Sequence, residues 1–354
     1  MASIFASIGL SGLIPALSLR RNSKEYVPVT RLDESASGCF SCPNRKSGGE
    51  ACASCPSRIY FTETKTVYRN EKARYGRKPP LRKNALALYM HLHFLNPDAN
   101  GYVSSIDEEE AASALGCSKR TVENNMRLLQ KNGYVSFGKT SVPDRLQAFI
   151  TDYKTAFLKA DEGGRGYLRI SRELFERLVA LPDVNSMRLA VRTYFEESEE
   201  ERRFGKETEK SLNEIKSRLP KYVTKKRLLE ILESDGFAEV FEVLKGSRSA
   251  SLFVRKRFDQ MRIAESLKAE CLAEVRKFAA AVNRKAGKKT PKLSLTPSET
   301  SDVCGTALKI PIPSVLEGLK RFYETYVKQG IPYGSAGALV RMFASAHAEY
   351  GFIP

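Results

Sequence analysis

The hydrophobic pattern is clearest between residues 104 and 139, where it predicts two short helices, a tight turn between them and a strand after them. The second helix is the better defined, because its apolar residues recur at steps of three and four and therefore share one face. These residues are Val122, Met126 and Leu129. Gly116 supplies the turn before this helix, and Gly133 can take the left-handed conformation that ends it.

Polar residues at both helix starts are of the kinds that cap helices. We expect Ser118 to cap the second helix, and Ser105 with Glu108 to form a capping box at the first. The acidic residues from Asp107 to Glu110 then lie in the first turn, where the helix dipole favours negative charge. This position explains the acidic run without a metal-binding or catalytic role.

A helix and a hairpin on either side of this stretch would complete a domain over residues 84–155. The helix is predicted at Asn84–Leu95 from its apolar periodicity. The hairpin is predicted from alternating residues at 134–137 and 146–153, with a turn at 140–145.

Residues 166–258 repeat this order of elements, although the two segments are only weakly similar in sequence. Two apolar helical runs come first, and Pro182 separates them. A further helix, a helix between a Thr224 cap and Gly236, and two strands follow. These elements are expected at 208–219, 225–235, 237–243 and 252–258.

Charge points to a polyanionic partner. The chain has 58 Lys and Arg against 41 Asp and Glu, a net charge of +17, which favours nucleic acid first and an anionic membrane second. In the first domain, side chains that hydrogen-bond base edges and phosphates gather on the polar side of the second helix. They are Lys119, Arg120, Thr121, Asn124 and Arg127. In the second domain, the phosphate contacts are expected from Lys225, Lys226, Arg227 and Arg248.

Four cysteines form two C-x2-C pairs, Cys39 with Cys42 and Cys52 with Cys55. Each pair offers two thiolates from one turn, and two such turns can close a tetrahedron around a structural Zn2+. An iron–sulfur cluster and redox thiols are the alternatives. The three other cysteines are scattered, which argues for reduced thiols and a reducing compartment such as the cytoplasm.

The remaining segments are assigned from composition. Residues 1–35 are an apolar segment that docks on the protein or is loose, with no membrane role, and residues 36–83 hold the zinc knuckle and a basic, extended arm. Residues 259–302 combine a long helix with a basic Ser/Thr/Pro linker. Residues 303–354 form a helical module suited to binding a second copy of the chain or another protein.

The spacing of Ala112, Gly116 and Val122 resembles the helix-turn-helix pattern of winged-helix DNA-binding domains. Two such domains in one chain resemble the replication initiators of plasmids and other mobile elements. The resemblance implies a mainly α protein with small β wings (α+β), which binds double-stranded DNA sequence-specifically at an origin, on a plasmid or the nucleoid. The zinc site departs from that family.

Enzymatic motifs are absent from the sequence. It contains no P-loop lysine motif, no Rossmann glycine pattern and no H-E-x-x-H. His91 and His93 are two positions apart and so lie on different sides of a helix, one in the core and one at the surface. We therefore expect no catalysis. The enzymatic alternative is a primase-like or nuclease-like zinc protein. The non-enzymatic alternatives are a transcription regulator that binds a promoter operator, and an adaptor or RNA-binding protein.

Overall fold

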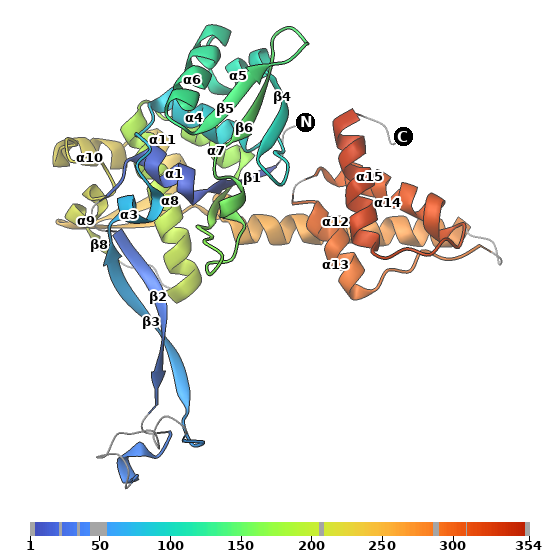
Figure 1. The fold of residues 1–354 in the computed structure, drawn as a ribbon, viewed down its shortest axis with the longest axis horizontal. Helices are drawn as coiled ribbons and strands as arrows, with labels where there is room; N and C mark the ends of the chain where they lie inside the picture. The colour runs from blue at the N-terminus through green and yellow to red at the C-terminus, as the bar shows by residue number, and fades with distance from the viewer. Residues whose placement is uncertain are drawn as a thin grey trace. The chain divides into compact units, whose positions relative to one another are not determined.

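The computed structural model describes residues 4–20, 23–33, 36–42, 55–204, 209–285, 290–308 and 310–350 (Figure 1). The chain falls into two units, one formed by residues 1–18 and 77–354 and the other by residues 19–76. Among the described residues, helices accompany four small antiparallel sheets of two or three strands each. This mixture confirms the expected α+β class.

The apolar N-terminus is an integral part of the first unit. Strand β1 (Phe5–Gly9) pairs antiparallel with β7 (Tyr167–Ser171), and every residue of helix α1 (Leu10–Leu17) is buried. Of the two expectations for this segment, docking is confirmed and a loose chain is wrong. The physical reason is its composition, because a helix that is apolar on all sides is stable only when it is enclosed on all sides.

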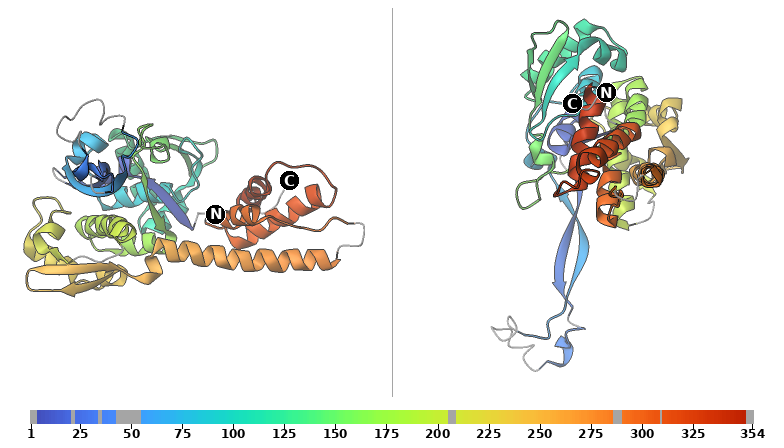
Figure 2. Two further views of the ribbon diagram at one scale, coloured as in Figure 1. Left: turned by 90° about the horizontal axis from the view of Figure 1, so that it is seen from below. Right: turned by 90° about the vertical axis from the view of Figure 1, so that its right-hand side faces the viewer.

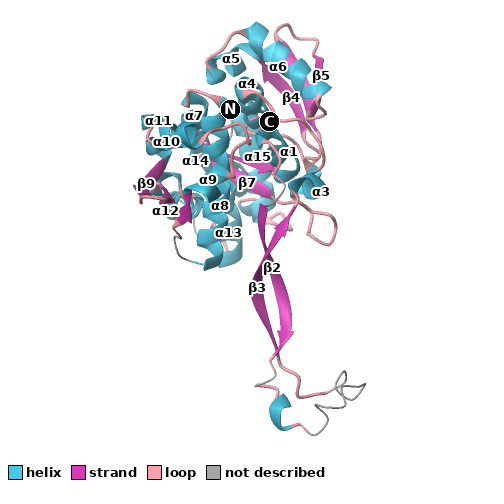
Figure 3. Cartoon of the chain, turned by 90° about the vertical axis from the view of Figure 1, so that its left-hand side faces the viewer, coloured by secondary structure: helices cyan, strands magenta, loops and turns pink. Residues whose placement is uncertain are grey.

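Residues 19–76 form a two-stranded ribbon, which Figure 3 shows in magenta. Strand β2 (Ser23–Leu32) pairs with β3 (Tyr60–Arg69) over ten residues, and the short helix α3 (Glu71–Tyr75) follows. The expected boundary at residue 35 is therefore wrong, because β3 pairs with β2, which lies on the other side of that boundary. The arm itself is extended from Tyr60 to Arg69, as strand β3. At the base of the ribbon, Arg20 donates to Glu71 from both its backbone N and its Nε.

Residues 83–150 follow the order helix, strand, helix, turn, helix and hairpin. The elements are α4 (Lys83–Leu92), β4 (Tyr102–Asp107), α5 (Glu108–Leu115), α6 (Lys119–Lys131), β5 (Val135–Lys139) and β6 (Arg145–Ile150). The strands form one antiparallel sheet in the order β4-β6-β5. The returning strand β6 ends earlier than expected, because residues 151–153 form a turn.

The cap of α5 differs from the expected capping box. Asp107 caps this helix and accepts hydrogen bonds from the backbone N of Glu109 and Glu110 at 2.9 and 3.0 Å. Ser105 lies within β4, in the irregularity of its pairing with β6 between Val103 and Ile106, and its hydroxyl accepts a hydrogen bond from Arg145. At α6 the expectation is confirmed, because the Ser118 side chain accepts from Thr121 N.

The core of this part lies between α4, α5, α6 and the sheet. Val122, Met126 and Leu129 are all fully buried, as their spacing predicted. His91 in α4 and His93, the C-cap of that helix, are both buried, so the expected surface histidine is wrong. His91 packs on Phe175, and His93 Nδ1 lies 2.9 Å from Tyr89 O.

Residues 184–254, yellow-green to orange in Figure 2, follow the order of residues 83–150 with one additional helix (Asp235–Val240) before the hairpin. After β7 and α7 (Arg172–Ala180), the elements are α8 (Val184–Phe204), β8 (Lys210–Ser211), α9 (Leu212–Lys216), α10 (Lys225–Leu232), α11 (Asp235–Val240), β9 (Phe241–Lys245) and β10 (Ser249–Val254). The sheet order, β8-β10-β9, is the same as in β4-β6-β5.

Two local expectations for this segment are wrong. The expected helix at 208–219 is replaced by the short strand β8, which pairs with β10, and by the five-residue helix α9. Gly236 does not end α10 but lies inside α11, where a Cβ atom would lie 3.2 Å from Leu181. Residues 237–240 are therefore helical, and the strand begins only at Phe241.

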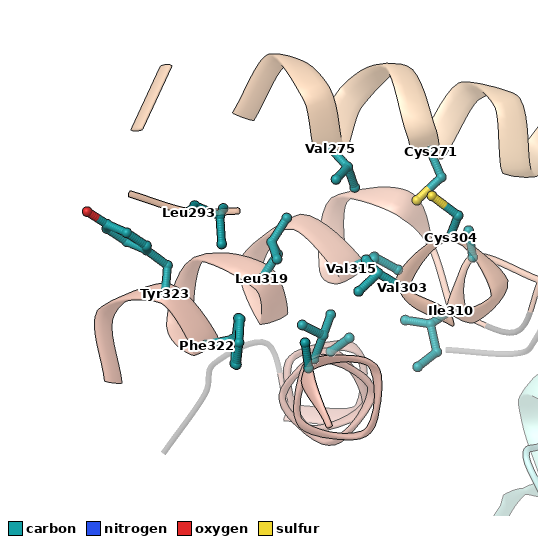
Figure 4. Packing of buried hydrophobic residues seen from close by; sticks show 14 residues of the cluster. Cys271, Val275, Leu293, Val303, Cys304, Ile310, Val315, Leu319, Phe322 and Tyr323 are labelled. Atoms are coloured by element: carbon teal, nitrogen blue, oxygen red, sulfur yellow. The ribbon is translucent and has the colours of Figure 1, made fainter. Parts of the chain in front are cut away.

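The C-terminal helices form a separate hydrophobic cluster. The helices are α12 (Gln260–Lys285), α13 (Pro297–Thr306), α14 (Ile312–Phe322) and α15 (Ala336–Tyr350), with a π-helical turn at Tyr323–Val327. Their buried side chains meet as Figure 4 shows. The expected linker up to residue 302 is wrong in part, because Leu293 is buried in this cluster and α13 begins inside the linker with a Thr296–Glu299 capping box.

None of the described helices combines the length and apolar composition needed to cross a bilayer.

Gly12→Ala should destabilise the protein by about 1–3 kcal/mol, because the core would be overpacked. A Cβ atom on Gly12 would lie 1.9 Å from the hydroxyl oxygen of the buried Tyr89. Gly305→Ala in α13 is the matched control, since nothing lies within 4 Å of its Cβ position. It should be stabilising by about 0.5–1 kcal/mol, the usual gain for this change in a helix. Urea unfolding measures both, and an unchanged stability of Gly12→Ala would contradict the packing.

The stability should fall as the pH falls from 6.5 towards 4. Burial lowers the pKa of His91 and of His93 to about 4, and Arg172 adds to the effect at His91. In the unfolded chain both pKa values return to about 6.5, so the unfolded state binds more protons in this window.

Near pH 5 the slope of the unfolding free energy against pH should approach about two protons per molecule, and about one in His91→Leu. Urea titrations at pH 5, 6 and 7 measure this slope. An identical slope in wild type and His91→Leu would refute the neutral, buried state of His91.

Candidate nucleic-acid interface

Helix α6 is anchored on one side and open on the other. Its buried face packs on α4, α5 and β5 through residues that are fully enclosed. Next to its C-terminal end, Tyr134 is also buried, and its hydroxyl donates to Pro79 O at 2.8 Å. The outer face of α6 is therefore held in place by packing that involves none of its outward-facing side chains.

The exposed side of α6 carries one continuous polar stripe. Arg120, Asn124 and Arg127 are exposed and follow one another at steps of four and three, which places them on the same face. Lys131 extends the stripe by one more turn. It was missed from the sequence, although the same i, i+4 and i+7 spacing would have included it.

Two residues of the predicted set already have ionic partners. The Lys119 ammonium lies 3.2 Å from Glu109 and 3.5 Å from Asp144, and the hydrogen bond to Glu109 raises the pKa of Lys119. Arg127 forms an ion pair with Glu123 one turn earlier, at 2.8 Å. Such exposed pairs are weak, so a phosphate could compete for either cation.

Thr121 has a structural task, because its hydroxyl lies 2.9 Å from that of the capping residue Ser118. For Arg120 and Asn124, by contrast, the described part of the chain offers no side-chain hydrogen bond or ion pair. These two side chains can therefore meet a ligand without first giving up a partner.

The hairpin turn after β5 is held in a defined shape beside the start of α6. Thr140 receives a hydrogen bond from Val142 N at 3.2 Å, and its backbone N donates to Arg145 O at 3.1 Å. Asp144 takes a positive φ of 57° and reaches Lys119. The turn and the first turn of α6 thus form one continuous surface.

The second repeat places its predicted contacts differently. Thr224 caps α10 as expected, and Lys225, Lys226 and Arg248 are exposed. Arg227 pairs with Asp183 at the start of α8 and with Glu230, so it joins two helices and is not open to a ligand.

The outer side of α10 is also more acidic than that of α6. Glu230 and Glu233 are exposed there, and Glu233 pairs with Lys245 of the following strand at 2.6 Å. Because these carboxylates would repel phosphates, α10 is electrostatically less suited than α6 to enter a DNA groove.

The candidate zinc ligands lie on the connection between β2 and β3. Cys39 is the first residue of a single 3-10 turn (Cys39–Ser41), and Cys42 follows that turn, with its backbone N donating to Cys39 O at 3.3 Å. Cys55 is partly exposed. Cys52 lies outside the described residues. Within the ranges that the structure describes, three or more metal-ligand side chains do not gather at one place.

Comparison of the chain with protein-family models, with curated proteins and with solved structures finds no match. The chemistry of the surfaces described above therefore carries the functional argument.

Proposed function

We propose that the chain is a sequence-specific double-stranded-DNA-binding protein with two winged-helix domains, at residues 83–150 and 184–254. The observation that carries the proposal is the exposed stripe of Arg120, Asn124, Arg127 and Lys131 on a helix whose opposite face is locked in the core. The repeated element order and the matching sheet orders support a tandem arrangement.

In this proposal α6 enters the major groove. Arg120 can donate two hydrogen bonds to a guanine, and Asn124 can pair with an adenine, which are the usual partners of these side chains. Lys119, Arg127 and the turn at 140–144 would contact phosphates and set the register of the helix. The second domain, through Lys225, Lys226 and Arg248, would add mainly phosphate contacts.

The biological role that we propose is initiation of replication on a plasmid or another mobile element. Two DNA-binding domains in one chain suit an origin with repeated sites, whereas a transcription regulator would bind an inverted repeat, usually as a dimer. The C-terminal helices would bind a second copy or a replication protein. The proposed function is binding and assigns no catalytic role to any side chain.

We further propose that Cys39, Cys42, Cys52 and Cys55 hold a structural zinc ion. With four sulfur ligands the ion would be coordinatively closed, and it would order the connection between β2 and β3.

Selection of duplexes from random and plasmid-derived DNA, at near-physiological salt, should enrich a defined site. On that site Arg120→Ala should weaken binding by about 1–3 kcal/mol and relax the preference at one base pair. Arg165→Ala, the same change at an exposed arginine outside α6, is the matched control and should leave binding unchanged. Enrichment of direct repeats would support an initiator, and an inverted repeat a regulator.

A different result would sink the base-reading role of α6. If no sequence is enriched and affinity only falls with salt, the protein is a non-specific binder. If Arg120→Ala loses the same affinity on every sequence, Arg120 contacts phosphate only.

Cys42→Ser should reduce the zinc content of the purified protein from about one ion per chain towards zero and increase proteolysis between β2 and β3. Cys117→Ser, at a partly exposed cysteine outside the two pairs, should keep the metal. Elemental analysis and limited proteolysis measure both variants. Wild-type protein without metal, but with the same protease resistance, would remove the zinc proposal.

A further inference from the structure

The described side chains of β2 and β3 do not form a core within the ribbon. Among the side chains described in its two strands, none is buried, and Tyr60, Phe61 and Tyr68 are 52%, 44% and 66% exposed. A two-stranded hairpin without packing on either face is at best marginally stable in water. A surface of this kind gains stability when a partner covers it.

The two faces of the ribbon differ in chemistry. The pairing register places most of the hydroxyl-bearing residues on one face, beside Leu32, and they are Thr30, Tyr60, Thr62, Thr66 and Tyr68. The other face is mixed. It carries the basic residues Arg31, Lys65 and Arg69 and the apolar residues Val27, Val29, Phe61 and Val67, and Arg31 is paired with Glu63 at 2.6 Å. Hydroxyl groups can both donate to and accept from base edges, and the basic side chains suit phosphates.

Charge in this unit has the same sign as in the rest of the chain. Residues 19–76 contain eleven Lys and Arg against six Asp and Glu. A positively charged surface with few buried apolar groups favours a polyanion over an apolar protein partner.

The dimensions of the ribbon fit a DNA groove. Ten paired residues at about 3.4 Å each span about 34 Å, which is about one helical turn of B-DNA. Two strands about 4.8 Å apart, with their side chains, match a major groove about 12 Å wide, which admits such ribbons.

We propose that the β2–β3 ribbon is a second DNA-binding element, which lies in the major groove of duplex DNA with its hydroxyl-bearing face towards the base edges. The proposal rests on duplex binding by the chain and extends the bound site beyond the segment read by α6. Lys65 contributes a phosphate contact, and Thr66 and Tyr68 contact bases.

Methylation protection of guanine N7, which lies in the major groove, tests this on the selected duplex with long flanks and full-length protein. A shortened ribbon, with residues 24–68 replaced by Asn-Gly, keeps the Ser23–Arg69 pair and the Arg20–Glu71 contact at the base, ends in a favoured two-residue turn and removes Lys65, Thr66 and Tyr68. Wild type should protect guanines over two segments. The shortened ribbon should lose one of them and keep the segment that Arg120→Ala weakens.

Point variants separate the two faces. Lys65→Glu should make the dependence of log affinity on log salt shallower by about one unit. The double variant Thr66→Ala with Tyr68→Ala should lose protection in the outer segment at nearly unchanged salt dependence. Lys328→Glu, the same charge change at an exposed lysine among the C-terminal helices, should alter neither property.

Three outcomes would overturn the proposal. The shortened ribbon could protect the same guanines as wild type. It could lose only affinity for single-stranded DNA, which would make the exposed aromatic residues a stacking surface. It could change the oligomeric state without changing the footprint, which would make the ribbon a contact between protein chains. Failure of duplex binding as a whole looks different, because wild type would then protect neither segment.

Discussion

The first half of helix α8 is the constraint on which the larger unit depends. Its residues from Ser186 to Tyr194 are all buried, and two of them are arginines. Arg188 donates to Leu81 O at 2.9 Å, just before α4, and Arg192 donates to Ser18 O, just after α1. A buried guanidinium is costly unless its donors are satisfied, so these backbone carbonyls must stay where α8 needs them. The helix thereby ties the N-terminal segment and the start of the first repeat to the second repeat.

The two repeats have similar orders of elements, but the exposed faces of their helices α6 and α10 differ in chemistry. In the first, the outer side of α6 is basic and amide-bearing, and Arg120 and Asn124 are ready for a ligand. In the second, Arg227 is used to hold α10 to α8, and acidic residues occupy the outer side. Under the proposed function, the first repeat would therefore recognise bases and the second would bind phosphates.

The ribbon and its cysteine-containing connection fit the same view. Among the described side chains of β2 and β3 none is buried, so these strands gain little stability from apolar packing between them. A zinc ion would order the connection from within, and a DNA groove would cover the strands from outside. Both proposals therefore address the same physical deficit, and each can be tested without the other.

Local features were predictable from the sequence because they depend on neighbours within one or two helical turns. The Ser118 and Thr224 caps, the buried face of α6 and the hairpin after it all belong to this class. Features that depend on pairing between distant segments could be found only in the tertiary structure. Strand β1 pairs with a segment more than 150 residues away, and β2 pairs with β3 across the cysteine-containing connection. Because β4 pairs with β6 as far as Asp107, helix α5 begins only after this residue, and Asp107 caps it in place of the expected Ser105. Periodicity shows which face of an element is apolar, but it does not identify the partner that covers that face.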